Sequence, residues 1–195
     1  MLYDKDIREP LFDYLEEKYH KVRILEEKRM GRSRADTIMI TVDSIIGIEI
    51  KSDADTYERL KRQVKDYNKF CDKNYIVVGK SHAKHIEKHV PIEWGILIID
   101  EREDGIVIDE KRELQDNPKR KMDWQIRWLW RPELNHILEL NHLPKYKQKN
   151  KAFVQQKLLE KVEIEILKCQ MCEELFERDY TLWDEMMEEY LIQKK

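Results

Sequence analysis

Three charged residues have the types and spacing that hydrolysis of a phosphodiester requires. Asp36 opens an apolar run rich in Ile, and Glu49 and Lys51 stand two residues apart at the end of the next run. Side chains alternate across a strand, so Glu49 and Lys51 are expected on one face, with Asp36 brought beside them by a tight hairpin. Mg²⁺ takes oxygen ligands, commonly one or two carboxylates, and a nearby lysine can orient or deprotonate a water. The trio therefore predicts a metal-dependent hydrolytic site.

The elements that would position this trio follow from apolar periodicity. Residues 35–42 and 45–51 predict two central strands joined at Asp43-Ser44. A helix is expected from Asp55 or Thr56, either of which could cap it, to about residue 71. The remaining expected elements are a helix over 7–19 with Pro10 in its first turn, a strand over 21–29, a strand over 75–78, a short helix over 81–90, and strands over 95–100 and 105–109.

The last third of the chain changes to helical periodicity. Helices are expected over 123–140, with a kink at Pro132, over 151–172, and over 179–192. The order of elements predicts an α/β layered domain over residues 1–122 and a helical C-terminal extension over residues 123–195.

A resemblance to a known family rests on these residues and two more. Asp36 followed by Glu49-Ile50-Lys51 matches the D…(D/E)-x-K signature of the PD-(D/E)XK, or restriction-endonuclease-like, superfamily, although Ala35 replaces its leading Pro. Gln63 and Tyr67 have the spacing of the Q-x-x-x-Y motif in RecB-like members. The chain resembles small bacterial and phage nucleases of this kind. The resemblance implies a core of helix, three-strand meander, helix and strand.

The same resemblance implies roles for individual residues. Asp36, Glu49 and the carbonyl of Ile50 would bind Mg²⁺ or Mn²⁺, and Lys51 would position or deprotonate the attacking water. Gln63 would orient Lys51, and Tyr67 would support the substrate or the core.

Further charged residues are candidates for the same site. Superfamily members often carry another acid on the first helix, for which Glu16 and Glu17 compete with Glu26 and Glu27 on the first strand. Arg34, Arg59 and Arg62, together with Arg32, flank the site and could contact phosphates. Each of these residues taken alone is also explained as a solvated surface charge.

Composition constrains the substrate and the compartment. The 195 residues are 41% hydrophobic and 39% charged with a net charge of −3, so the whole chain has no basic signature. Residues 111–151 nevertheless carry a net charge of +6, and residues 152–195 carry −5. The basic stretch could hold a polyanion or form a solvated helix face. Its Trp124 and Trp128 could stack on bases, although packing against the sheet is favoured.

The sequence thus predicts a nuclease that hydrolyses phosphodiester bonds of nucleic acid, with DNA as the expected substrate. Three cysteines form no disulfide framework, and no apolar run of about 18 residues or signal peptide is present, so a cytoplasmic protein without a membrane segment is expected. The alternative is a catalytically silent nuclease-like binding module, or a phage or mobile-element accessory protein acting through a protein partner. A homodimer remains open.

Overall fold

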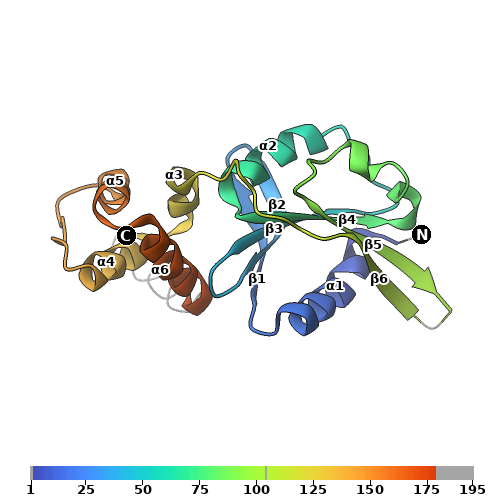
Figure 1. The fold of residues 1–195 in the computed structure, drawn as a ribbon, viewed down its shortest axis with the longest axis horizontal. Helices are drawn as coiled ribbons and strands as arrows, with labels where there is room; N and C mark the ends of the chain where they lie inside the picture. Colours follow the sequence, from blue (N-terminus) through green and yellow to red (C-terminus); the bar gives the residue numbers. More distant parts are fainter. Residues whose placement is uncertain (1, 104, 179–195) are drawn as a thin grey trace, which may run out of the picture.

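The computed structural model, which describes residues 2–103 and 105–178, is a mixed α/β fold built on one six-stranded sheet (Figure 1). The strands lie in chain order: β1 (Arg23–Met30), β2 (Ser33–Ile40), β3 (Ile45–Lys51), β4 (Lys73–Gly79), β5 (Gly95–Arg102) and β6 (Gly105–Arg112). The first three strands form an antiparallel meander, β3, β4 and β5 are parallel to one another, and β6 returns antiparallel. An α/β layered fold is therefore confirmed.

Two helices cover opposite faces of this sheet. Helix α1 (Asp4–Tyr19) buries Ile7, Leu11 and Leu15 against one face, and α2 (Leu60–Phe70) packs on the other. The alternation along β4 shows this division, since Tyr75 and Val77 join the α1 core and Ile76 and Val78 join the α2 core. Every residue of β3 is buried, as expected for a central strand covered on both faces.

Several local expectations prove wrong. Pro10 lies inside α1 rather than in its first turn, because the helix begins earlier, at Asp4. Neither Asp55 nor Thr56 caps α2; the helix begins after Arg59 without a side-chain cap, and Asp55 instead accepts hydrogen bonds from Ser52. The segment expected as one short helix forms two 3₁₀ turns, η1 (Lys80–His82) and η2 (Ile86–Lys88).

The C-terminal helices are shorter than expected. The first is divided into α3 (Met122–Gln125), η3 (Ile126–Trp128) and α4 (Arg131–Leu140), because Pro132 opens α4 rather than kinking a longer helix. The second is divided into α5 (Lys151–Lys161) and α6 (Ile164–Glu177), and the Glu163 carboxylate caps α6 by accepting from the Ile166 N–H at 3.1 Å. The helix expected over 179–192 lies outside the described residues.

The C-terminal helices share a core with the α2 face of the sheet. Phe70, at the end of α2, contacts the rings of Trp124 and Trp128, both with centroids 5.4 Å away. Both tryptophans therefore pack against the core on this side of the sheet, as the sequence favoured, and both side chains stay partly exposed. In the described part of the chain, no helix is both long enough and apolar enough to span a bilayer.

Candidate active site

The candidate site lies where the β2–β3 ladder opens. The last paired residues are Thr37 and Ile48, and beyond them a tyrosine hydroxyl enters between the strands. The Asp36 N–H donates to the Tyr67 hydroxyl (3.2 Å), which donates to the Ile48 carbonyl (2.8 Å). Gly47 makes room for this ring, because a Cβ at that position would lie 2.4 Å from Tyr67 Cδ1. Tyr67 therefore holds the two strands apart and satisfies both backbone groups.

The opening leaves the Ile50 N–H without a β2 partner, and the Asp36 carboxylate takes its place. Asp36 Oδ2 accepts from this N–H at 2.8 Å, which fixes the carboxylate beside the end of β3. Asp36 and Glu27 are also not paired in the β1–β2 ladder, although the neighbouring pairs Glu26–Thr37 and Lys28–Ala35 are. The expected placement of Asp36 alongside the Glu49-Ile50-Lys51 segment is confirmed by this contact.

We expect Tyr67→Phe to destabilise the protein by about 1–3 kcal/mol. Without the hydroxyl, the Asp36 N–H and the Ile48 carbonyl both lose their hydrogen-bond partner. Tyr57→Phe is the matched control, since the Tyr57 hydroxyl is buried and has no hydrogen-bond partner. Urea unfolding of both variants measures the difference. Equal midpoints for the two variants would contradict the bridging role of Tyr67.

Glu49 and Lys51 share the α2 face of β3, as the period of a strand predicts. Glu49 is 0% exposed and Lys51 4% exposed, and Lys51 Nζ lies 2.5 Å from Glu49 Oε1. Gln63, on the first turns of α2, donates through Nε2 to the same oxygen at 2.5 Å. The sequence predicted that Gln63 orients Lys51. In the structure Gln63 bonds Glu49, which in turn bonds Lys51, so any effect of Gln63 on Lys51 passes through Glu49.

Burial dominates the electrostatics of the two carboxylates. Burial, assisted by the negative charge of Asp36 and opposed by Lys51, raises the pKa of Glu49 to about 7. Burial likewise raises the pKa of Asp36, against the lowering effects of the Ile50 N–H and of Lys51. The two acids therefore hold protons more tightly than isolated carboxyl groups do.

This raised pKa predicts a pH-dependent stability. The pKa of Glu49 is about 7 in the folded protein and 4.5 ordinarily, so folding favours the protonated side chain. The stability that this preference contributes is fully present below pH 4.5 and is lost as the pH rises through 7. Between pH 4 and pH 8, the free energy of unfolding of the wild type should fall by on the order of 3 kcal/mol relative to that of Glu49→Gln. Urea unfolding with EDTA at several pH values measures this difference. A difference that stays constant with pH would show that Glu49 titrates normally.

A cavity of about 290 Å³ opens above these residues and collects most of the sequence candidates. Asp36, Ile50, Lys51 and Gln63 line its floor. Its rim carries the predicted arginines Arg34, Arg59 and Arg62, together with Arg32. Tyr67, in contrast, is fully buried beneath the cavity, so a direct substrate contact is wrong for this residue and its role is structural.

The four candidates for a further acid in the site lie in different places relative to the cavity. Glu16 and Glu17 are exposed near the C-terminal end of α1, about 18 Å along the helix from Asp4, and neither lines the cavity. Glu27 lines it and is paired with Arg8 and Arg34. Glu26 bonds Arg8 at 2.7 Å without lining the cavity.

The sequence did not predict four residues that line the cavity: Asp4, Arg8, Ser33 and Asp55. Arg8 bonds Asp4 at 2.7 Å and donates to the Asp36 carbonyl at 3.3 Å, which ties the start of α1 to the site. Their i,i+4 spacing on one helix was the available signal. Asp4, rather than Glu16 or Glu17, is the acid that the first helix brings to the cavity.

The arrangement fits the Mg²⁺ or Mn²⁺ that the sequence resemblance implies. Among the described residues no group of three or more His, Cys, Asp and Glu could hold a metal, but Mg²⁺ commonly takes only one or two carboxylates in addition to water and substrate oxygens. Glu49 Oε2 and Gln63 Oε1 are buried without a hydrogen-bond partner. Unpaired buried oxygens of this kind call for a water or an ion.

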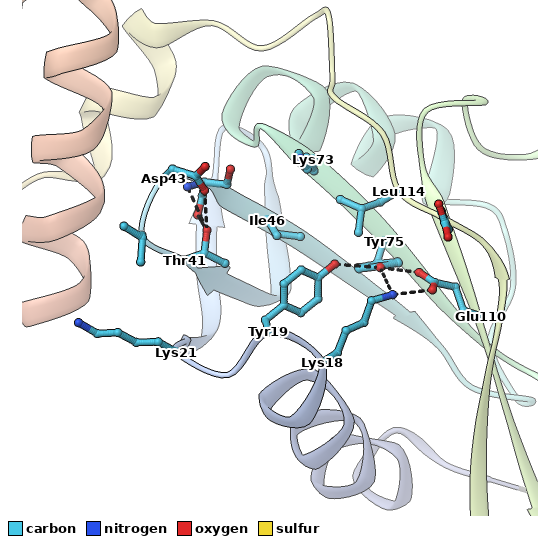
Figure 2. Close-up of a pocket in the computed structure, with 13 residues that line it drawn as sticks. Lys18, Tyr19, Lys21, Thr41, Asp43, Ile46, Lys73, Tyr75, Glu110 and Leu114 are labelled. Carbon is cyan, nitrogen blue, oxygen red and sulfur yellow. Dashed lines mark hydrogen bonds and ion pairs between the residues drawn. The ribbon is translucent and has the colours of Figure 1, made fainter.

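A second cavity, of about 540 Å³, lies at the opposite end of β3 (Figure 2). Its polar groups already satisfy one another: Tyr75 donates to Glu110 at 2.7 Å, Lys18 contacts the same carboxylate at 2.5 Å, and the Tyr19 and Tyr75 hydroxyls are 3.0 Å apart. Its lysines Lys18, Lys21 and Lys73 are balanced by Asp43, Glu110 and Glu113. This balance makes it a weaker candidate than the cavity above Glu49.

The fold and the site define a mixed α/β protein with two carboxylates and a lysine at the open end of a central hairpin. Over residues 1–194 the chain matches the family described as bacteriophage P4 protein cII, and it belongs to that phage protein family. No curated protein matches the chain. A solved structure of SfsA from Pyrococcus furiosus in complex with Ca²⁺ is similar at 20% identity and a TM-score of 0.36, over 57% of this chain and 64% of that one, less than two thirds of its length.

Proposed function

We propose that this protein is a Mg²⁺- or Mn²⁺-dependent nuclease that hydrolyses phosphodiester bonds of nucleic acid, with DNA as the expected substrate. The observation that carries the proposal is that Asp36 and Lys51 line one arginine-rimmed cavity. Glu49 does not line this cavity; it lies buried behind it, in contact with Lys51 and Gln63. Charged groups are costly to bury without partners. A purely structural role gives little reason to bury Glu49 with one oxygen unsatisfied.

Each residue would have a separate task. Asp36 and Glu49 would hold the ion with the Ile50 carbonyl, and the bound ion would supply Lewis-acid activation of the phosphoryl group and acidify water. Lys51 would orient the attacking water or stabilise the charge that develops on the phosphate oxygens. Gln63 keeps Glu49 in place. Arg34, Arg59 and Arg62 would bind the flanking phosphates.

The order of elements supports the proposal. Helix α1, the meander β1–β3, α2 and β4 follow the helix, three-strand meander, helix and strand that the resemblance to the PD-(D/E)XK superfamily implies. The proposed site lies at the carboxyl end of β3, which runs parallel to β4. Ligands of open α/β sheets generally bind beyond the carboxyl ends of their strands. We therefore propose a restriction-endonuclease-like core for this chain.

The direct test is cleavage of single-stranded, duplex and branched DNA and of RNA, each with Mg²⁺ and with Mn²⁺. Cleavage of at least one substrate that EDTA abolishes is expected. An intact substrate in all eight reactions, with protein shown to be folded, would overturn the proposal.

The second candidate function is binding without cleavage. The mutual contact of Lys51 and Glu49 favours it, because that ion pair is satisfied without any metal. Calorimetric titration with Mn²⁺ separates the two functions. Binding of the ion that depends on Glu49 supports the nuclease, and its absence supports a silent module or an accessory protein that acts through a partner.

A further inference from the structure

A third cavity, of about 250 Å³, lies between the β1–β2 hairpin and the C-terminal helices. Its cationic lining consists of Lys28, Arg29, Arg127, Lys151 and Arg178. Among the described residues that line it none is acidic. Glu133, outside the lining, bonds Arg178 at 2.6 Å and offsets one of these charges. The charged side chains among these described lining residues are thus all cationic, which suits an anionic ligand.

Aromatic rings accompany these cations. Trp128 and Trp130 line the same cavity, and both are partly exposed. The Arg178 guanidinium carbon lies 4.1 Å from the centre of the Trp130 ring, and Phe70 stacks on Trp128. These contacts hold both rings in fixed orientations. A cationic cavity with fixed aromatic walls suits a ligand that is both anionic and planar.

A cationic surface connects this cavity to the proposed active site. Arg32 and Arg62 line the active-site cavity and also a pocket along α2, whose other cations are Lys61, Lys65 and Lys69. Glu58 and Asp66 also line this pocket, so its five cations outnumber two acids. In the last turn of α2, Lys69 Nζ lies 5.0 Å from the centre of the Trp124 ring, and the Arg127 guanidinium carbon lies 3.9 Å from the same centre. Arg127 in turn lines the cavity of Trp128 and Trp130. Figure 1 shows α2 leading from the sheet toward α3.

We propose that this surface, the α2–tryptophan track (Arg32, Lys61, Arg62, Lys65, Lys69, Arg127, Trp128 and Trp130), binds the single-stranded flank of the nucleic-acid substrate. The inference rests on the proposed nuclease function and names its substrate class. Phosphates follow the cations along α2, and a base enters the cavity against the tryptophan rings. The part of the track along α2 from Lys61 to Lys69 is about 12 Å long, which is enough for several phosphates of one strand.

The rings favour an unpaired strand over a duplex. Base faces become available to side chains only where a strand is unpaired, and proteins that bind single strands combine a cationic groove with aromatic stacking platforms. The cavity in Figure 2 does not have a cationic lining, because its three lysines are matched by three acids. The two cavities therefore provide a test surface and a control surface on one molecule.

The first arm of the test measures the phosphate contacts along α2. Binding of fluorescent dT20 by the full chain is followed by anisotropy in EDTA, so that no cleavage occurs. Lys61→Ala/Lys65→Ala, at two exposed positions, should weaken binding and reduce the slope of log K against log salt by about 1.4, or about 0.7 for each lost phosphate contact. The control Lys21→Ala/Lys73→Ala changes the charge equally at the Figure 2 cavity and should leave the slope unchanged.

The second arm measures stacking. Trp130→Leu should weaken dT20 binding by roughly 5- to 150-fold, the range expected for one lost base–aromatic stack. The same variant should bind an abasic 20-mer about as well as the wild type does, because that strand keeps its phosphates and lacks bases. A 20-bp duplex should bind more weakly than dT20.

The possible outcomes separate the two proposals. Equal salt slopes for the two lysine pairs, or duplex binding tighter than dT20 binding, would overturn the track even if the protein cleaves nucleic acid. Track-dependent binding of dT20 by a protein that cleaves nothing would remove the nuclease proposal and leave a strand-binding surface. If Trp130→Leu does not fold, the lysine pair, which lies at the surface, still decides the result.

Discussion

Lys51→Ala should reduce metal-dependent cleavage by roughly 10²- to 10⁴-fold, the range that a positioned proton-transfer group commonly contributes. Lys51 is the cation that contacts Glu49, and it lines the floor of the cavity beside Asp36. Rates of cleavage with saturating Mn²⁺, measured at equal protein concentration, give the effect.

Two further variants make this result interpretable. Lys51→Ala also leaves Glu49 buried without its cation, so thermal melting must show that the variant is folded. Lys51→Arg keeps the charge while changing its shape, and only partial activity is expected from it. Lys88→Ala, at an exposed position on η2, is the matched control. Cleavage by Lys51→Ala at the wild-type rate would remove Lys51 from the proposed site.

Glu49→Gln and Asp36→Asn should each weaken Mn²⁺ binding by at least about 100-fold. Loss of an outer-shell partner of a metal site costs 10- to 100-fold in affinity, and these two residues are the proposed direct ligands. Isothermal titration calorimetry of the folded variants at pH 8 measures the affinity. The pH matters because the pKa of Glu49 is about 7, so a proton competes with the ion in more acidic buffer.

Glu16→Gln provides the control for the metal experiment. Glu16 is an acid on the same helix as Asp4, but it lies near the opposite end and outside the cavity. Its substitution should leave Mn²⁺ affinity unchanged. If Glu16→Gln weakens binding as much as Glu49→Gln, the ion binds elsewhere and the proposed site is wrong.

Local patterns in the sequence determined the strands and the chemistry of the central residues. The Ile-rich runs around Asp36 and Glu49 predict the hairpin, because two buried strands separated by a tight turn have few other ways to cover their apolar side chains. The two-residue period then places Glu49 and Lys51 on one face, which the structure confirms. These features depend only on neighbours along the chain.

The sequence did not predict where the helices in the last third of the chain end. Apolar periodicity continues across Leu129–Trp130 and across Val162–Glu163, yet the helices break there. The short helices pack on one another, α4 against both α5 and α6, while α3 packs against α2 and α6 against β2. Tertiary contacts therefore override the local pattern.

Only the tertiary structure decided how the site is completed. Gln63 reaches Glu49 rather than Lys51, the Tyr67 hydroxyl parts β2 from β3, and Asp4 and Arg8 approach from the start of α1. The same is true of the contacts that bring Lys69 and Arg127, 58 positions apart in the sequence, to the ring of Trp124. Periodicity assigns a side chain to a face of its own element, whereas contacts between distant elements depend on how whole elements pack.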